Sequence, residues 1–492
     1  MDFLNLTIAD AHHLLTRREV SAVELTQAAL DRIVAVDNTV KAFLSIDDEG
    51  ALEQARAADL RIEHGNARPL TGIPLAIKDV LCMRDTATTC GSKMLEDWVA
   101  PYDATAIVKL KAESAVLLGK VNMDEFAMGS STENSAFFVT RNPWDVERVP
   151  GGSSGGSAVA VATGEALGSL GTDTGGSIRQ PAALCGVTGL KPTYGRVSRF
   201  GLVAFASSLD QIGPFGRTAR DCALLLEAIA GADINDSTAA REPVPHYAGL
   251  LDGDLRGLRV GVPREYFVEG MEPGVEQAVR AAIDVLRDQG AQIVEVSLPH
   301  TKYAVPVYYI VAPAEASANL ARFNGVRYGL HIAGDSVWDE MELTRGAGFG
   351  SEVRRRIMLG TYALSAGYYD AYYKRAQQVR TLIRRDFQRA FEQVDVLAAA
   401  TTPTVAFRIG EKTDDPLAMY LNDVLTLPAS LAGVPGLTLP CGMSDGLPVG
   451  LQLLGRPFDE GTLLRVGDAY QRVTDWHTRR PELAVSETDE AE

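Results

Sequence analysis

Residues 150–183 read PGGSSGGSAVAVATGEALGSLGTDTGGSIRQPAA and lie in the part of the chain that is densest in glycine and serine. Two apolar runs, at 158–162 and 166–170, are long enough only for a packed helix or a buried strand. Residues 172–177 read TDTGGS, and their two glycines predict a turn that leads into a helix from Ile178 onward. Such a turn directs consecutive backbone N–H groups toward one point, as an oxyanion hole requires; they belong to Thr174, Gly175, Gly176 and Ser177.

Other interpretations of these glycines remain open. Gly151–Gly155 satisfies the GxSxG elbow of α/β-hydrolases, but that site also needs a histidine, and none of the later histidines (246, 300, 331 and 477) lies in a glycine-flanked loop. A phosphate loop needs GxxxxGK[ST], which is absent. Leu75–Lys78 is similar to the lysine strand of a kinase, yet HRD and DFG are missing. Each motif taken singly also fits a simple tight turn.

Outward from this stretch, the chain alternates short apolar runs with helical segments. Residues 73–77 form an apolar run that ends in Lys78, and residues 115–118 and 258–262 predict further strands. The first 60 residues predict helices that begin at the capping boxes of Thr7 and Ser21, and 351–393 is the strongest helical stretch. This pattern predicts an α/β fold in one large domain, residues 1–480, with an acidic disordered tail at 481–492.

Composition narrows the classes of function. The chain has 492 residues and a formal net charge of -17. Because so acidic a surface repels phosphate backbones, the chain is a poor candidate for binding nucleic acid by itself. The sequence shows no signal-peptide pattern and no 18-residue apolar run, so we expect no membrane span. Five scattered cysteines favour reduced thiols in the cytoplasm. No histidine or cysteine spacing indicates a metal site.

Lys78, Ser153 and Ser177 together predict a serine nucleophile that has no histidine base. A lysine acts as a base when burial lowers its pKa enough to leave it neutral. A serine between base and nucleophile can pass the proton, because a hydroxyl both donates and accepts hydrogen bonds. An ion pair between Lys78 and its neighbour Asp79 would defeat this role, so we expect Asp79 to point away.

The stretch 150–183, with Lys78 upstream, closely resembles the signature of the amidase signature family. The resemblance implies one large α/β domain with a mixed central β-sheet covered by helices. It implies that Lys78 is the base, that Ser153 is a relay serine held after a cis peptide bond, and that Ser177 is the nucleophile that forms the acyl ester. The activity implied is that of a Ser–Ser–Lys amidase.

Five longer runs are similar to one branch of that family, the A subunits of bacterial Glu-tRNA(Gln)/Asp-tRNA(Asn) amidotransferases: 122–138, 191–216, 315–329, 349–374 and 422–440. This implies glutamine as substrate, with Arg356 for its α-carboxylate, Asp423 for its α-ammonium and Tyr308 in the same pocket. Most residues in an arginine run such as 354–356 are solvated, which is the competing interpretation for Arg356.

The same resemblance implies a cytoplasmic heterotrimer that also contains B and C subunits. Ammonia released from glutamine would pass to the B subunit, which would hold ATP and Mg²⁺ and most of the tRNA, while the C subunit would bridge the two. No cofactor is implied for this chain. Two alternatives stay open: a stand-alone amidase that acts on another small amide, and a catalytically dead binding subunit.

Overall fold

The computed structural model describes residues 3–483, so most of the predicted acidic tail, from residue 484 on, lies outside the described residues. Its centre is one mixed sheet of eleven strands. From one edge to the other the strands are β1 (Phe43–Ile46), β3 (Val116–Val121), β2 (Pro74–Lys78), β4 (Gly168–Asp173), β6 (Gln211–Gly216), β5 (Thr188–Lys191), β10 (Gly436–Ser444), β11 (Leu447–Gly455), β9 (Val396–Ala400), β7 (Arg259–Pro263) and β8 (Gln292–Val296).

Parallel and antiparallel pairs divide the sheet. β2 lies parallel to both β3 and β4, and β7 lies parallel to both β8 and β9. The strands between these groups pair antiparallel, including the β10–β11 hairpin. β2, β3 and β4 are buried along their whole length, as parallel strands with both faces covered must be. The predicted strands at 73–77, 115–118 and 258–262 are confirmed as β2, β3 and β7, each within a few residues.

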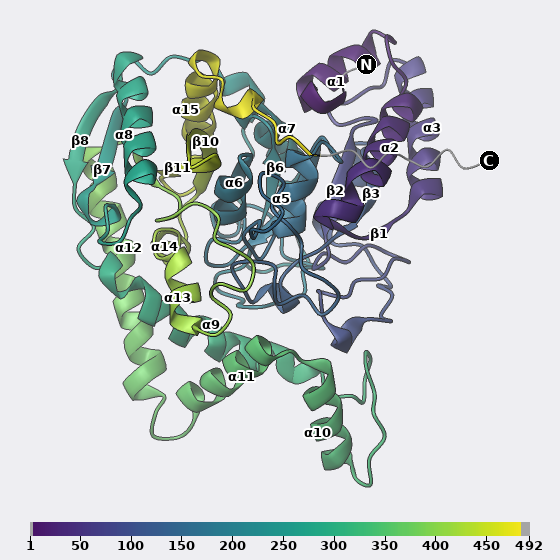
Figure 1. Ribbon diagram of the computed structural model, residues 1–492, viewed down its shortest axis with the longest axis vertical. Helices are drawn as coiled ribbons and strands as arrows, with labels where there is room; N and C mark the ends of the chain where they lie inside the picture. Colours follow the sequence, from purple (N-terminus) through teal and green to yellow (C-terminus); the bar gives the residue numbers. More distant parts are fainter. Residues whose placement is uncertain (1–2, 484–492) are drawn as a thin grey trace.

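Helices cover this sheet (Figure 1). They are α1 (Ile8–Thr16), α2 (Ala22–Val40), α3 (Asp48–Glu63), α4 (Thr105–Ala112), α5 (Gly155–Ala162), α6 (Arg179–Cys185), α7 (Ala219–Ile229), α8 (Pro273–Asp288), α9 (Ala304–Asn319), α10 (Val337–Gly348), α11 (Ser351–Leu364), α12 (Arg375–Gln393), α13 (Pro416–Tyr420), α14 (Leu427–Ala432) and α15 (Glu460–Val473). Both predicted capping boxes are present, at Thr7 with Asp10 and at Ser21 with Glu24. Among the described residues, no helix combines the length and apolarity that crossing a bilayer requires.

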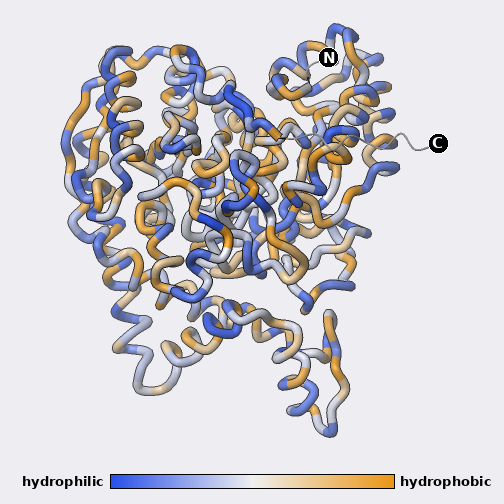
Figure 2. Tube along the Cα trace, viewed as in Figure 1, coloured by the Kyte–Doolittle hydropathy of each residue, from blue (hydrophilic) through white to orange (hydrophobic). Residues whose placement is uncertain are grey.

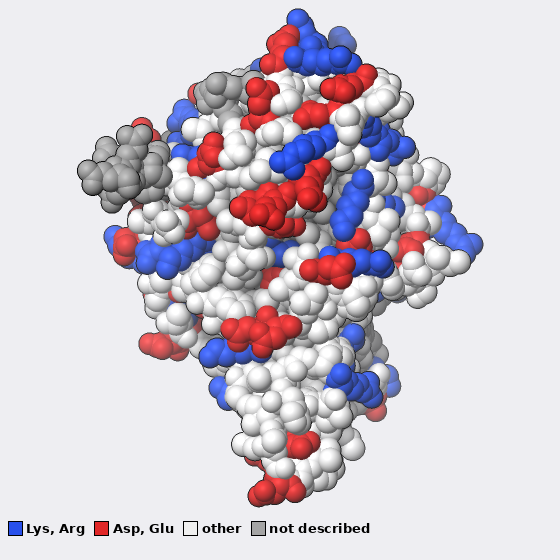
Figure 3. All heavy atoms as spheres, turned by 90° about the vertical axis from the view of Figure 1, so that its right-hand side faces the viewer, with Lys and Arg blue, Asp and Glu red and all other residues white. Residues whose placement is uncertain are grey.

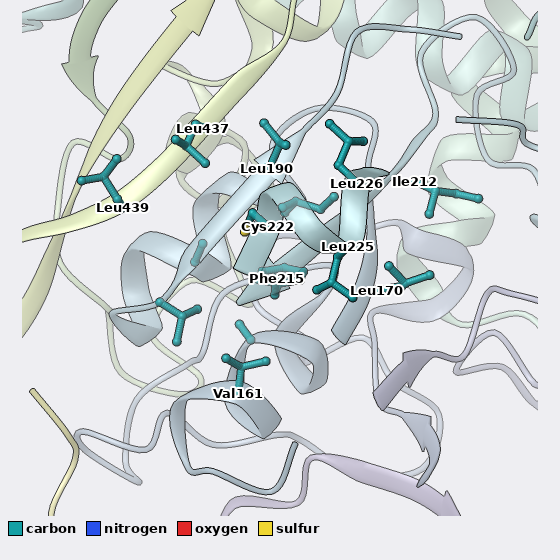
Figure 4. Packing of buried hydrophobic residues seen from close by; sticks show 14 of the residues in the cluster. Val161, Leu170, Leu190, Ile212, Phe215, Cys222, Leu225, Leu226, Leu437 and Leu439 are labelled. Carbon is teal, nitrogen blue, oxygen red and sulfur yellow. The ribbon is translucent and has the colours of Figure 1, made fainter. Parts of the chain in front are cut away.

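The core fills the space between strands and helices. Figure 4 shows side chains of β4, β6, β5 and β10 packed against those of α5 and α7: Leu170, Ile212, Phe215, Leu190, Leu437, Leu439, Val161, Cys222, Leu225 and Leu226. Peripheral helices are amphipathic, and along α8 the buried residues recur at helical spacing: Val275, Val279, Ala282, Ile283 and Leu286. Hydrophobic and hydrophilic residues accordingly alternate along these helices in Figure 2.

α10 and α11 form an arm that projects from the body (Figure 1). α11 packs along α9, and at Gly360 the two backbones lie so near that an added Cβ would be 1.9 Å from the carbonyl oxygen of Pro313. The helix predicted over 351–393 is interrupted: α11 ends at Leu364, and a short π-helical segment (Asp370–Lys374) leads into α12. Arg356 is one of the buried residues of α11, so the arm places this side chain against the body of the protein.

Candidate active site

Lys78 stands at the end of β2 and is fully buried. Its Nζ lies within hydrogen-bond distance of three hydroxyl oxygens, those of Ser153, Ser154 and Thr172, each at 2.8 Å. No carboxylate of the described residues forms an ion pair with it. Asp79 points away, as expected, and pairs instead with Lys120 at 2.8 Å.

The environment of Lys78 favours its neutral form. Burial lowers the pKa of Lys78 to about 7, although the more distant carboxylates of Asp124, Asp173 and Asp210 act in the opposite direction. Hydroxyl oxygens cannot compensate a buried positive charge as a carboxylate would. The lysine can therefore exchange a proton with a serine near neutral pH.

Ser177 lies in the turn that joins β4 to α6, and it is 7% exposed. The helix begins at Arg179, one residue later than predicted, with Ile178 as its N-cap. Ser154 N donates to the Ser177 carbonyl oxygen at 3.2 Å, which holds this turn against the segment that carries Ser153. The peptide bond between Gly152 and Ser153 is cis, as the resemblance implied.

Buried ion pairs and hydrogen bonds fix both sides of the turn. Asp173 pairs with Arg179 at 3.0 Å and accepts a hydrogen bond from Ile178 N at 3.3 Å. Thr174 Oγ1 donates to Asp210 at 2.7 Å. The backbone N–H groups of Thr174, Gly175, Gly176 and Ser177 donate to no residue between 3 and 483. A rigid turn with unused donors is the arrangement that stabilises an oxyanion.

Two glycines let other chain segments approach the turn closely. A Cβ on Gly175 would lie 2.8 Å from Cζ of Tyr308, and one on Gly176 would lie 2.3 Å from Oγ1 of Thr426 and 3.3 Å from Oδ1 of Asp423. The turn of Ser177 is thus in contact with two of the predicted substrate-binding residues. The hydroxyl of Tyr308 itself makes no hydrogen bond with the described part of the chain.

Asp423 is buried and only half satisfied. Its Oδ2 accepts a hydrogen bond from Ser130, whereas Oδ1 has no partner among the described residues. Burial raises the pKa of Asp423 to about 7, and the hydrogen bond from Ser130 and the charge of Arg356 hold it from rising further. A buried carboxylate oxygen without a donor is suited to a ligand that brings one.

Arg356 is 3% exposed, so the solvated interpretation of this arginine is wrong, whereas Arg354 and Arg355 beside it are exposed. Its Nε donates to Glu352 at 2.7 Å. Arg356 lines a small cavity of about 160 Å³ together with Ser131, Glu352 and Tyr420. Its Cζ lies 5.2 Å from the ring centre of Tyr309, and that ring packs edge-on against the ring of Tyr308 with 5.1 Å between centres. The positive charge of Arg356 acts to lower the pKa of both Tyr308 and Asp423.

Four polar residues of this site were not predicted from the sequence. Ser154 and Thr172 bind Lys78, Ser130 binds Asp423, and Glu352 binds Arg356. Ser154 and Thr172 lie within the quoted glycine-rich stretch, and Glu352 precedes Arg356 by one helical turn, which was the available signal. Within residues 3–483, no three histidine, cysteine, aspartate or glutamate side chains gather as ligands for a metal ion.

Comparison with known proteins places this geometry in a family. The model of the Amidase family matches residues 24–464. The A subunit of glutamyl-tRNA(Gln) amidotransferase from Roseiflexus sp. (strain RS-1) is 72% identical over 480 residues, covering 98% of this chain and 99% of that protein.

Two solved structures show the same fold. The crystal structure of the A subunit of glutamyl-tRNA(Gln) amidotransferase from Thermotoga maritima is 43% identical with a TM-score of 0.82, covering 99% of each chain. Native peptide amidase from Stenotrophomonas maltophilia is 33% identical with a TM-score of 0.83, covering 98% of this chain and 99% of that one. The fold and family predicted from residues 150–183 are confirmed. The chain belongs to the amidase family, in the branch of the glutamyl-tRNA(Gln) amidotransferase A subunits.

Proposed function

We propose that this chain is the glutaminase subunit of a tRNA-dependent amidotransferase, and that it hydrolyses glutamine through a glutamyl ester on Ser177. The observation that carries the proposal is the buried Lys78, which has no carboxylate partner among the described residues and is hydrogen-bonded to Ser153 beside the turn of Ser177. A lysine held in this way serves as a base.

The reaction proceeds by proton transfer along the three residues. Neutral Lys78 takes the proton of Ser153 while Ser153 takes that of Ser177, and Oγ of Ser177 attacks the side-chain amide carbon of glutamine. The oxyanion accepts hydrogen bonds from the N–H groups of residues 174–177. The proton returns through Ser153 to the amide nitrogen, the C–N bond breaks, and ammonia leaves. A water molecule then attacks the ester by the same route and releases glutamate.

The substrate pocket has one charged group for each charge of glutamine. Arg356 receives the α-carboxylate, because a guanidinium forms two parallel hydrogen bonds with such a group. Oδ1 of Asp423, which has no partner in the described residues, receives the α-ammonium. Tyr308 lies against Gly175 and completes the wall of the pocket beside the nucleophile.

The partners follow from the relatives, which are A subunits of glutamyl-tRNA(Gln) amidotransferases. We place ATP, Mg²⁺ and most of the tRNA on the B subunit of the complex, with a C subunit that bridges the two chains. We place that complex in the cytoplasm, where five free cysteines stay reduced. The net charge of -17 supports this division. On the face drawn in Figure 3, acidic and basic side chains are interspersed, unlike a basic nucleic-acid surface.

Replacing the nucleophile tests the proposal. Ser177→Ala should lower glutamine hydrolysis by the assembled complex by a factor on the order of 10⁴ or more. The same complex should still amidate misacylated tRNA when free ammonia is supplied, because that step belongs to the partner. Ser237→Ala, at an exposed serine far from the site in sequence, is the matched control and should keep parental activity. Retention of glutaminase activity within tenfold in Ser177→Ala would refute the assignment.

A further inference from the structure

We propose that Glu352 is a positioning residue which, together with Tyr420, orients Arg356 so that its terminal nitrogens face the α-carboxylate of glutamine. This inference rests on the proposed function and adds the residues that set specificity for a free α-carboxylate.

Glu352 is buried and binds three neighbouring side chains. Its Oε1 accepts two hydrogen bonds, from Arg356 Nε at 2.7 Å and from the Tyr420 hydroxyl at 2.8 Å, while Oε2 pairs with Arg355. Glu352 and the two arginines lie on the first turns of α11, and Tyr420 ends α13. One carboxylate oxygen thus ties the substrate arginine to a second element of the fold.

The bond to Nε decides which donors of Arg356 remain available. A guanidinium has five N–H groups in one plane. The hydrogen bond to Glu352 uses the N–H on Nε, which is the one nearest the aliphatic part of the side chain. The terminal nitrogens donate to no residue in the described part of the chain, and they are not sealed from the cavity. They are the pair that a carboxylate engages side by side.

Aromatic rings hold the plane of the guanidinium. The Cζ of Arg356 lies 5.2 Å from the ring centre of Tyr309, 5.4 Å from that of Tyr420 and 5.6 Å from that of Phe205. Tyr309 and Tyr420 also stack on each other with 3.8 Å between ring centres. Tyr420 therefore contributes twice, through its ring to Arg356 and through its hydroxyl to Glu352.

The net charge of Glu352 and its two arginines favours binding of an anion. Two arginines share one carboxylate, so the cluster keeps one positive charge, and Arg356 is buried. Burial raises the pKa of Glu352, but the charge of Arg356 and the bonds from Arg356 and Tyr420 outweigh it, and the net pKa lies below its usual value. A carboxylate entering the cavity would neutralise the remaining charge, whereas a neutral amide would not.

Steady-state kinetics of the assembled complex test this inference with Glu352→Gln and Tyr420→Phe. Gln keeps an acceptor for Nε but removes the charge, and Phe keeps the ring but removes the hydroxyl. We expect KM for glutamine to rise roughly tenfold in Glu352→Gln and roughly threefold in Tyr420→Phe, with kcat within about twofold. Hydrolysis of propionamide, which has no carboxylate, should be unchanged. Glu276→Gln breaks an exposed Glu–Arg pair of the same i, i+4 spacing on α8 and should change neither substrate.

The outcomes separate this inference from the proposed function. If Arg356→Leu raises KM for glutamine selectively while both positioning variants leave it unchanged, the inference is overturned and the proposed function stands. If glutamine and propionamide activities fall together with the melting temperature, Glu352 is structural only, and the inference is again overturned. A parent complex that does not hydrolyse glutamine refutes the proposed function, and the inference with it.

Discussion

Lys78 differs from most buried lysines because its partners are three hydroxyl oxygens and no carboxylate of the described residues. The sequence places it correctly at the end of an apolar strand, yet it cannot show where the neighbouring Asp79 points. That depends on Lys120 of the adjacent strand β3, whose ammonium takes the carboxylate away. A sequence pattern identifies the types of residues in a site, whereas their pairing depends on the sheet.

Lys78 and Asp423 predict an unusual dependence on pH. For catalysis Lys78 must be neutral and Asp423 must be ionised, so both groups are active in their deprotonated forms. Burial brings the pKa of each group to about 7. Because kcat/KM reports the free enzyme, it should rise with pH through about 7 with a logarithmic slope of about two, and then level off. The ammonium of bound glutamine lowers the pKa of Asp423, so kcat should rise with a slope of about one.

Substitution at Lys78 and Asp423 checks that pH profile. Asp423→Asn should reduce the slope of kcat/KM to about one, and Lys78→Arg should be nearly inactive because a guanidinium cannot release its proton. Lys78→Arg with activity close to that of the parent would refute the neutral-lysine mechanism. The measurement is initial-rate glutaminase activity between about pH 5 and pH 9.

Arg356 and Asp423 should control glutamine affinity. Arg356→Leu and Asp423→Ala each remove one partner of a buried charge pair with the substrate, which costs roughly 2 kcal/mol or more and raises KM for glutamine about thirtyfold. Neutral amides should lose less. Equal losses for glutamine and for propionamide would instead indicate a damaged fold, which thermal unfolding of the same variants would reveal.

At the scale of elements, the crossing of α9 and α11 fixes the arm that carries Arg356. Helix boundaries can be predicted where residues close together in the sequence form a capping box, as at Thr7 and Ser21. The break at 365–369 contains Gly367, which adopts a φ of +88°, but a lone glycine is tolerated inside a helical pattern, so that residue alone does not predict the break. The contact at Gly360 could not be foreseen either, since only the fold shows which backbone faces that glycine.

The α9–α11 contact makes Gly360 a test of the arm. In Gly360→Ala the new methyl group would overlap the Pro313 carbonyl, and we expect unfolding free energy to fall by about 1–3 kcal/mol. Gly346→Ala, in α10 with open space around its Cα, should instead stabilise by up to about 1 kcal/mol through helix propensity. Thermal or denaturant unfolding compares the two, and a Gly360→Ala variant as stable as Gly346→Ala would contradict the packing described.

For the molecule as a whole, the sequence predicted an α/β layer fold, but it could not predict the order of the strands. Among the described strands, β7 and β8 connect to the rest of the sheet through the pairing of β9 with β11. These two strands lie about fifty residues apart in sequence, and no local pattern encodes their pairing.

The five cysteines provide a measure of whole-molecule integrity. All are free and buried, and burial raises the pKa of each thiol, so the reactive thiolate is scarce. Ellman's reagent should therefore label none of them in the native protein and all five after denaturation. Rapid labelling of a native thiol would show that the surrounding core opens.

The place of the β10–β11 hairpin has a consequence for biosynthesis. The hairpin pairs with β5 on one side and with β9 on the other. A growing polypeptide that has emerged only as far as α14 therefore contains the strands of both parts of the sheet, but the backbone N–H and C=O groups on the open edges of β5 and β9 have no strand to pair with. Residues 423–455 thus supply both the hairpin that joins the two parts of the sheet and Asp423 of the glutamine pocket. Translation must therefore pass residue 455 before the enzyme can acquire both its continuous sheet and its complete substrate pocket.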